Sequence, residues 1–188
     1  METFEAIKNR RSIRKFLNKR VSADLLEELI EAARLAPSAM NLQPLEYIIV
    51  NREDLLLKLF DCTEWKNYSF ASGPERGEEP KAYIVILSNT LIKSRNIEMD
   101  AGLAIENILL LAQSEGLASC CLGSVSWGQI NRLLGIPNSH YGLLLIALGY
   151  PKQSASFVDS DDRKIRSVDE KIIVSKNPLE KIIHKNYF

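Results

Sequence analysis

The sequence contains few of the residues that build metal centres, disulfide frameworks or nucleophilic active sites. Its three cysteines are odd in number and two of them, Cys120 and Cys121, are adjacent, so they describe neither a disulfide framework nor a zinc site. The two histidines, His140 and His184, have no carboxylate or cysteine neighbours at metal-ligand spacing. We therefore expect no metal site, and a reducing compartment, the cytoplasm, as the location of the protein.

The sequence also lacks the features that attract membranes or nucleic acids. The longest apolar region, 101–112, is interrupted by Glu106 and Asn107 and is too short to span a bilayer. The first residues, METFEAIKNRR, contain no apolar signal core. With 24 basic and 24 acidic residues the formal net charge is zero, so no global field attracts nucleic acid. We expect neither a membrane nor a nucleic acid as a partner.

Common catalytic and nucleotide-binding motifs are missing as well. No Walker pattern, no GxGxxG and no GxSxG occurs along the chain. Because no protein nucleophile is evident, the sequence favours a cofactor as the carrier of the reactive atom, and we expect no catalytic side chain.

Length and composition predict one domain over 1–188, with 46% hydrophobic residues. A helix is expected to begin after Ser22, a predicted N-cap. The helix predicted over 96–114 is apolar nearly all round, so we expect it to lie both in the core and in a dimer interface. A loop is expected over 67–81, where glycine and proline are frequent. The predicted strands, including one late extended segment, cover 47–50, 82–87, 118–122, 143–148 and 171–174.

One cluster of charge stands out in this neutral chain, the sequence RRSIR with Arg10, Arg11, Ser12 and Arg14. Guanidinium groups with a hydroxyl among them can hold a phosphate through bidentate hydrogen bonds. A charged cluster alone is more often a solvated surface, so its meaning depends on the motifs that accompany it.

A second polar motif separates a predicted helix from a predicted strand. Pro37 and Pro44 forbid continuation of the helix, because proline lacks an N–H and biases the preceding residue toward extended conformations. Between them lie Ser38, Asn41 and Gln43. An amide side chain offers both a donor and an acceptor, so these residues suit a polar, flat ligand.

Four motifs in order, RRSIRKF, APSAMNLQP, GLASCCLGS and LGIPNSHYGLLLIALGYP, resemble the nitroreductase family of FMN-dependent enzymes. The resemblance runs from about residue 5 to residue 151, with a weaker match over 163–174. It implies a three-layer α+β fold, with a mainly antiparallel sheet flanked by helices, in an intertwined homodimer with a flavin at each interface. It also implies that the C-terminal segment, about 155–188, reaches the partner subunit.

The resemblance further implies which residues bind FMN. The positions that hold its phosphate and ribityl chain are matched by Arg10, Arg11, Ser12 and Arg14. The segment that reaches the flavin from the partner subunit is matched by Pro37, Ser38, Ala39 and Asn41. Gly123 and Ser124 match the turn whose backbone N–H groups approach the N5 and O4 edge of the ring. Arg163 or Arg166 resembles the late basic residue that completes the phosphate site.

The function implied by the resemblance is a ping-pong reaction. NADH or NADPH delivers hydride to flavin N5, and a small acceptor such as a nitroaromatic, a quinone or a free flavin then occupies the same face. Trp65, Tyr68 and Phe70 are candidates for lining the substrate pocket, although aromatic residues are more often core or loop anchors. Two alternatives remain open: another flavin reaction on the same scaffold, namely oxidation, dehalogenation or flavin cleavage, or non-catalytic flavin storage.

Overall fold

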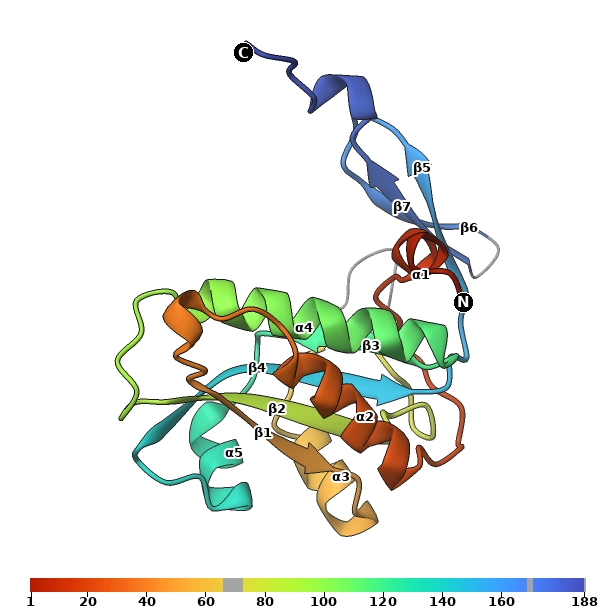
Figure 1. Cartoon of the computed structure of the whole chain (residues 1–188). Coiled ribbons are helices and arrows are strands. Elements are labelled where there is room, and N and C mark those ends of the chain that lie inside the picture. The colour runs from red at the N-terminus through yellow and green to blue at the C-terminus, as the bar shows by residue number, and fades with distance from the viewer. Residues whose placement is uncertain (66–72, 169–170, 188) are drawn as a thin grey trace.

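A four-stranded antiparallel sheet lies at the centre of the computed structural model, which describes residues 1–65, 73–168 and 171–187 (Figure 1). Its hydrogen-bonded order is β1-β2-β4-β3. The strands are β1 (Leu45–Val50), β2 (Ala82–Asn89), β3 (Ala118–Leu122) and β4 (His140–Gly149). The middle strand β2 is buried along nearly its whole length and β4 over its second half, which agrees with the continuous apolar runs in both. All four predicted strands of this sheet are confirmed.

Helices cover both faces of the sheet (Figure 1). On one face lie α2 (Ala23–Arg34) and α4 (Ile97–Ser114), and on the other lie α3 (Glu53–Phe60) and α5 (Trp127–Leu134). Side chains alternate along β2, so that Ile84 and Ile86 pack with α2 and α4 while Tyr83, Val85 and Leu87 enter the opposite core. The predicted three-layer α+β fold is confirmed.

Local signals in the sequence set the ends of several helices. The Ser22 hydroxyl accepts a hydrogen bond from the backbone N of Leu25 at 3.3 Å, which confirms the predicted N-cap of α2. The long helix α4 follows the prediction and buries one face against the sheet. Its opposite side keeps Met99 and Leu103 exposed, with 65% and 42% of their surface accessible. Its core role is confirmed, and its role in a dimer interface stays a prediction.

The C-terminal residues form a small second sheet that stands away from the central one (Figure 1). Its strands are β5 (Ala155–Asp159), β6 (Ile165–Val168) and β7 (Lys171–Lys176), in the order β5-β7-β6, and a short 3-10 turn, Leu179–Lys181, follows them. We call residues 155–187 the C-terminal arm. The helix α1 (Thr3–Asn9) lies at its base. Only β7 was predicted, because β5 and β6 are mostly polar and exposed and carry little hydrophobic signal.

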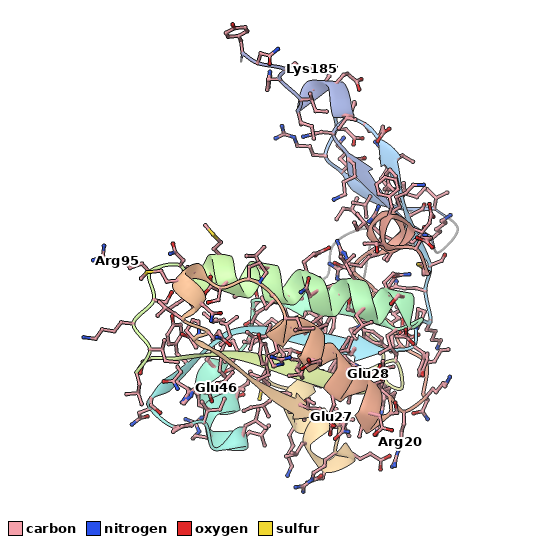
Figure 2. All side chains as sticks on the ribbon, viewed as in Figure 1. Arg20, Glu27, Glu28, Glu46, Arg95 and Lys185 are labelled. Carbon is pink, nitrogen blue, oxygen red and sulfur yellow. The ribbon has the colours of Figure 1, made fainter. Side chains whose placement is uncertain are left out.

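Charged side chains point outward from both parts, as Figure 2 shows for Glu27 and Glu28 on α2 and for Lys185 at the end of the arm. Within the described ranges, no helix has the length and apolar character needed to cross a membrane. Of the loop predicted over 67–81, residues 67–72 lie outside the described part of the chain, and so do Tyr68 and Phe70.

Candidate functional site

The basic segment after α1 runs as an extended chain beside the edge of the central sheet. Ser12 forms a parallel bridge with Ser119 of β3, and the backbone N of Ile13 donates to the carbonyl oxygen of Ser119 at 3.0 Å. Because β3 is an edge strand, this segment covers backbone groups that the sheet leaves unpaired.

The extended conformation separates the members of the RRSIR cluster. Successive side chains of an extended chain point to opposite faces, so Arg10, Ser12 and Arg14 share one face while Arg11 and Ile13 occupy the other. The cavities agree with this division, since Arg14 lines one and Arg11 lines another together with Ile13. Three of the four predicted phosphate ligands therefore lie on one side of the segment.

Arg14 contributes to a cavity of about 140 Å³ at the end of β3. The other residues that line it are Glu64, Trp65, Cys120, Cys121, Leu122, Gly123 and Ser124. A Cβ placed on Gly123 would meet no atom within 4 Å, so the backbone of this turn is open on that side. The carbonyl oxygen of Ser124 accepts from the backbone N of Glu64 at 2.9 Å, which fixes the turn. The structure thus brings together Arg14, Gly123 and Ser124, which are far apart in the sequence.

Arg10 approaches α4. The Nε of Arg10 lies 3.6 Å from Oε1 of Glu106. This Nε is buried and has no hydrogen-bond partner among the residues that the structure describes. A buried guanidinium N–H without a partner is an available donor for an anion that reaches this face. In the sequence, Glu106 was noted only as an interruption of an apolar run.

Arg11 serves a different purpose from its neighbours. Its side chain is 9% exposed, its Nη2 donates to the carbonyl oxygen of Lys8 at 2.8 Å, and its guanidinium lies over the Phe157 ring at 4.8 Å from the centroid. Burial, and secondly the charge of Arg10, lower the pKa of Arg11. Arg11 therefore joins α1 to the C-terminal arm, and the structure does not bring it to the Arg14 cavity.

The second predicted motif forms a turn held by a buried carboxylate. Ser38 Oγ donates to Oδ2 of Asp100 at 2.6 Å and accepts from the backbone N of Gln43 at 2.9 Å, while the backbone N of Ala39 donates to Oδ1 of Asp100 at 3.0 Å. Asp100 is only 2% exposed and belongs to the first turn of α4. Sequence analysis missed it, although an acidic residue on an otherwise apolar helix is a usable signal.

This turn, residues 37–43, which we call the Ser38 loop, is strained and presents its tip to solvent. Met40, Asn41 and Gln43 have φ angles of 54°, 55° and 50°. These angles lie in the left-handed region, where a residue other than glycine is destabilised by on the order of 1–3 kcal/mol. Met40 is 90% exposed. Pro37, Ser38 and Gln43 also line a separate cavity of about 160 Å³. Such strain persists only where the surroundings enforce it, and here Asp100 does so.

Within one chain the two motifs do not meet. Asp100 and Glu106 lie roughly 9 Å apart along the axis of α4 and on different faces of it, because each residue rises about 1.5 Å and turns about 100°. The late basic residues, Arg163 and Arg166, belong to the C-terminal arm, which stands away from the central sheet (Figure 1). Arg166 pairs there with Asp162.

The residues around Arg14 fit one part of FMN. A guanidinium suits its phosphate, and backbone N–H groups at an open glycine turn suit the polar edge of its ring. The cavity, of about 140 Å³, is smaller than the roughly 300–1,000 Å³ of usual cofactor sites. Among the described residues, no group of three His, Cys, Asp or Glu side chains is arranged to hold a metal ion.

The fold and the site together define an α+β protein with an arginine and an open glycine turn in one cavity at the edge of its central sheet. The model of the nitroreductase family matches residues 7–150, so the chain belongs to the nitroreductase family. A relative from Archaeoglobus fulgidus, provisionally named NADH dehydrogenase/NAD(P)H nitroreductase, is 32% identical over 86% of this chain and 92% of its own length. The structure of an FMN-dependent nitroreductase from Clostridium difficile R20291 matches with a TM-score of 0.74 and 26% identity, over 98% of this chain and 99% of that chain.

The family confirms the predicted class, an FMN-dependent NAD(P)H oxidoreductase, with FMN as cofactor and NADH or NADPH as co-substrate. The chain is also similar to a protein named for a different reaction. An iodotyrosine deiodinase from Drosophila melanogaster is 27% identical to it, over 88% of this chain and 68% of the deiodinase.

Proposed function

We propose that the protein passes hydride from NADH or NADPH to a small acceptor such as a nitroaromatic, a quinone or a free flavin. The observation that carries this proposal is the meeting of Arg14 with the Gly123–Ser124 turn in one cavity of a nitroreductase-family chain. When bound, FMN supplies the atom, N5, that accepts and releases the hydride. No side chain is assigned a covalent role.

The side chains and backbone groups of the cavity bind and orient the cofactor. Arg14, with Arg10 and Ser12 on the same face, holds the phosphate through charge-assisted hydrogen bonds. The backbone N–H groups of Gly123 and Ser124 donate to the polar edge of the ring, where they stabilise growing negative charge. Trp65 lines the cavity and excludes water from it.

The site is completed by a second copy of the chain. Apolar side chains remain exposed on α1, on α4 and at the end of the arm, as in Phe4 (67%), Met99 (65%) and Ile182 (58%). Pairing of two chains through these faces buries them and brings the Ser38 loop of one copy to the Arg14 cavity of the other, so that Pro37, Ser38, Ala39, Asn41 and Gln43 reach the flavin.

In this arrangement, residues 1–188 form one domain whose segment 155–188 reaches the second copy. Arg163 or Arg166 then completes a phosphate site from the arm. The three cysteines are free thiols, in keeping with a reducing cytoplasm as the location of the homodimer.

The test of this function is the visible absorption spectrum of the purified protein, before and after addition of NADH or NADPH without oxygen. Flavin bands that bleach, and that return with a nitroaromatic or a quinone, support the proposal. Flavin that binds but is not reduced supports storage instead. Absence of flavin binding after reconstitution with FMN refutes the proposed function.

Reductive dehalogenation is a second candidate, because an iodotyrosine deiodinase is among the similar proteins. It predicts release of iodide from iodotyrosine by the reduced protein, with little turnover of nitroaromatics or quinones. Steady NAD(P)H oxidation with those acceptors, and no iodide release, argues against it.

A further inference from the structure

One helix carries both the anchor of the Ser38 loop and an exposed apolar surface. Asp100 on α4 is buried, and its carboxylate accepts from Ser38 Oγ at 2.6 Å and from the backbone N of Ala39 at 3.0 Å. Met99 and Leu103, its near neighbours on α4, are exposed. The carboxylate that holds the loop therefore lies within about one helical turn of the surface proposed to pair with a second chain.

The buried carboxylate and the loop depend on each other. Each oxygen of Asp100 accepts a hydrogen bond from the loop, and within the described part of the chain no Lys, Arg or His side chain forms a salt bridge with it. A buried carboxylate without a cation is stabilised chiefly by its hydrogen-bond donors. The same two hydrogen bonds thus satisfy Asp100 and fix the loop on α4.

Other contacts tie the two ends of the loop to the rest of the domain. Asn107 Nδ2 of α4 donates to the carbonyl oxygen of Ala32 near the end of α2 at 3.0 Å. After the loop, the backbone N of Asn89 donates to the carbonyl oxygen of Pro44 at 2.8 Å. Between these fixed ends, Asp100 holds the interior of the loop, where the backbone is strained.

We propose that Asp100 is a positioning residue for the flavin bound by the other copy of the chain: it fixes the Ser38 loop on α4, so that the loop meets the partner's cavity in its binding conformation. This inference rests on the proposed function, in which the Ser38 loop of one copy completes the flavin site of the other.

The physical basis is preorganisation of the loop. A loop held in its binding conformation before the ligand arrives loses less conformational entropy on binding, so the affinity is higher. Without the carboxylate, the left-handed residues of the loop relax to other conformations, because such strain persists only while the surroundings enforce it. Since α4 also carries the exposed apolar surface, the anchor sets the position of the loop relative to the second chain.

The first experiment measures FMN affinity by fluorescence quenching after removal of bound flavin. Asp100→Asn keeps the shape of the side chain but leaves one acceptor oxygen in place of two. We expect it to weaken FMN binding about tenfold, because Ser38 or Ala39 loses its charged acceptor. Asp54→Asn, the same substitution at an exposed position in the first turn of α3, is the matched control and should bind FMN like the original protein.

Mixed dimers distinguish an effect on the other copy from an effect on the same chain. A chain with Asp100→Asn and a chain with Arg14→Ala are co-expressed with different affinity tags, and the mixed dimer is isolated through both tags. If Asp100 acts on the other copy, both defects fall on one site, and the remaining site should bind FMN with the affinity of the original protein. If Asp100 only stabilised its own chain, each site would carry one defect and neither would bind normally.

Two results would overturn the inference: normal FMN binding by the Asp100→Asn homodimer, or a mixed dimer without a site of original affinity. If Asp100→Asn does not fold, Asp100→Glu is measured in its place with the same expectation. Its longer side chain displaces the carboxylate, and the cavity of about 160 Å³ that Asp100 lines leaves room for it.

The two proposals fail in different ways. Failure of the original protein to bind FMN overturns the proposed function and this inference together. Normal FMN binding and reduction in the original protein, with unchanged FMN affinity in Asp100→Asn, overturns the positioning role alone.

Discussion

Two arginines three positions apart offer a matched test of the site, because the extended backbone sends them to opposite faces. Arg14 lines the cavity with Gly123, whereas Arg11 is buried against Phe157 and Lys8. Arg14→Ala should therefore weaken FMN binding. Arg11→Ala should destabilise the fold and leave FMN affinity nearly unchanged in the protein that remains folded.

The magnitudes follow from the contacts. A charged hydrogen bond to phosphate contributes about 1.5–3 kcal/mol, so Arg14→Ala should raise the Kd for FMN by roughly 10- to 150-fold. Arg11 loses a charged hydrogen bond, about 1.5–3 kcal/mol, and a cation–π contact of about 0.5–1 kcal/mol. The sum, about 2–4 kcal/mol, should lower Tm by roughly 5–15 °C in a chain of this size.

Flavin fluorescence quenching measures the affinity, and thermal unfolding monitored by circular dichroism measures the stability, on the same preparations. The reasoning is refuted if Arg11→Ala weakens FMN binding as much as Arg14→Ala does. It is refuted equally if Arg14→Ala binds FMN like the original protein, since the phosphate site must then lie elsewhere.

Three further changes test the rest of the structure. Leu103→Asp places a carboxylate on the exposed apolar side of α4 and should yield a folded monomer without FMN. Leu57→Asp, the same change at an exposed leucine of α3, is the control and should remain dimeric. Light scattering after gel filtration distinguishes monomer from dimer, and a monomer with full flavin content would contradict the shared site. Asp100→Ala removes two hydrogen bonds from the Ser38 loop and should cost about 3 kcal/mol, seen as a fall in Tm of roughly 6–12 °C; an unchanged Tm would show that Asp100 does not hold the loop. Burial by itself raises the pKa of Glu78, but the backbone N–H of Glu75 and the ammonium groups of Lys152 and Lys15 outweigh it and lower the pKa to about 2. The stabilising effect of Glu78 is therefore present above the ordinary carboxyl pKa and is lost as pH falls toward 2. Denaturant unfolding should show Glu78→Gln less stable than the original protein at pH 7, with a smaller difference at pH 3, and a difference that grows on acidification would refute this assignment.

The RRSIR cluster shows where prediction from the sequence reached its limit. The residue types, together with the accompanying motifs, predicted an anion-binding cluster, and the chain brings Arg14 to a cavity with Gly123 and Ser124. Which arginines face that cavity depends on the backbone between them, and the extended conformation arises from pairing with Ser119 of β3. A pairing partner so distant in sequence leaves no local signal, so Arg11 was grouped with the others.

The Ser38 loop shows the same limit from another side. Two prolines predicted the end of the helix, and the polar residues between them predicted a functional turn, because both effects are local. The conformation of that turn, with three residues in the left-handed region, depends on Asp100, which lies 62 positions from Ser38. A strained turn of this kind requires an external partner, and only the packing of α4 against the turn supplies it.

By itself, the sequence determined the central sheet, the helices α2 and α4 and the two polar motifs, because hydrophobic periodicity, caps and prolines act over a few residues. Only the tertiary structure decided which polar side chains meet. It joined Arg14 to Gly123 across the edge of the sheet, turned Arg11 toward the arm, and placed Asp100 against the Ser38 loop. These contacts link segments far apart in the chain, and their geometry follows from packing of the whole domain, which no local pattern records.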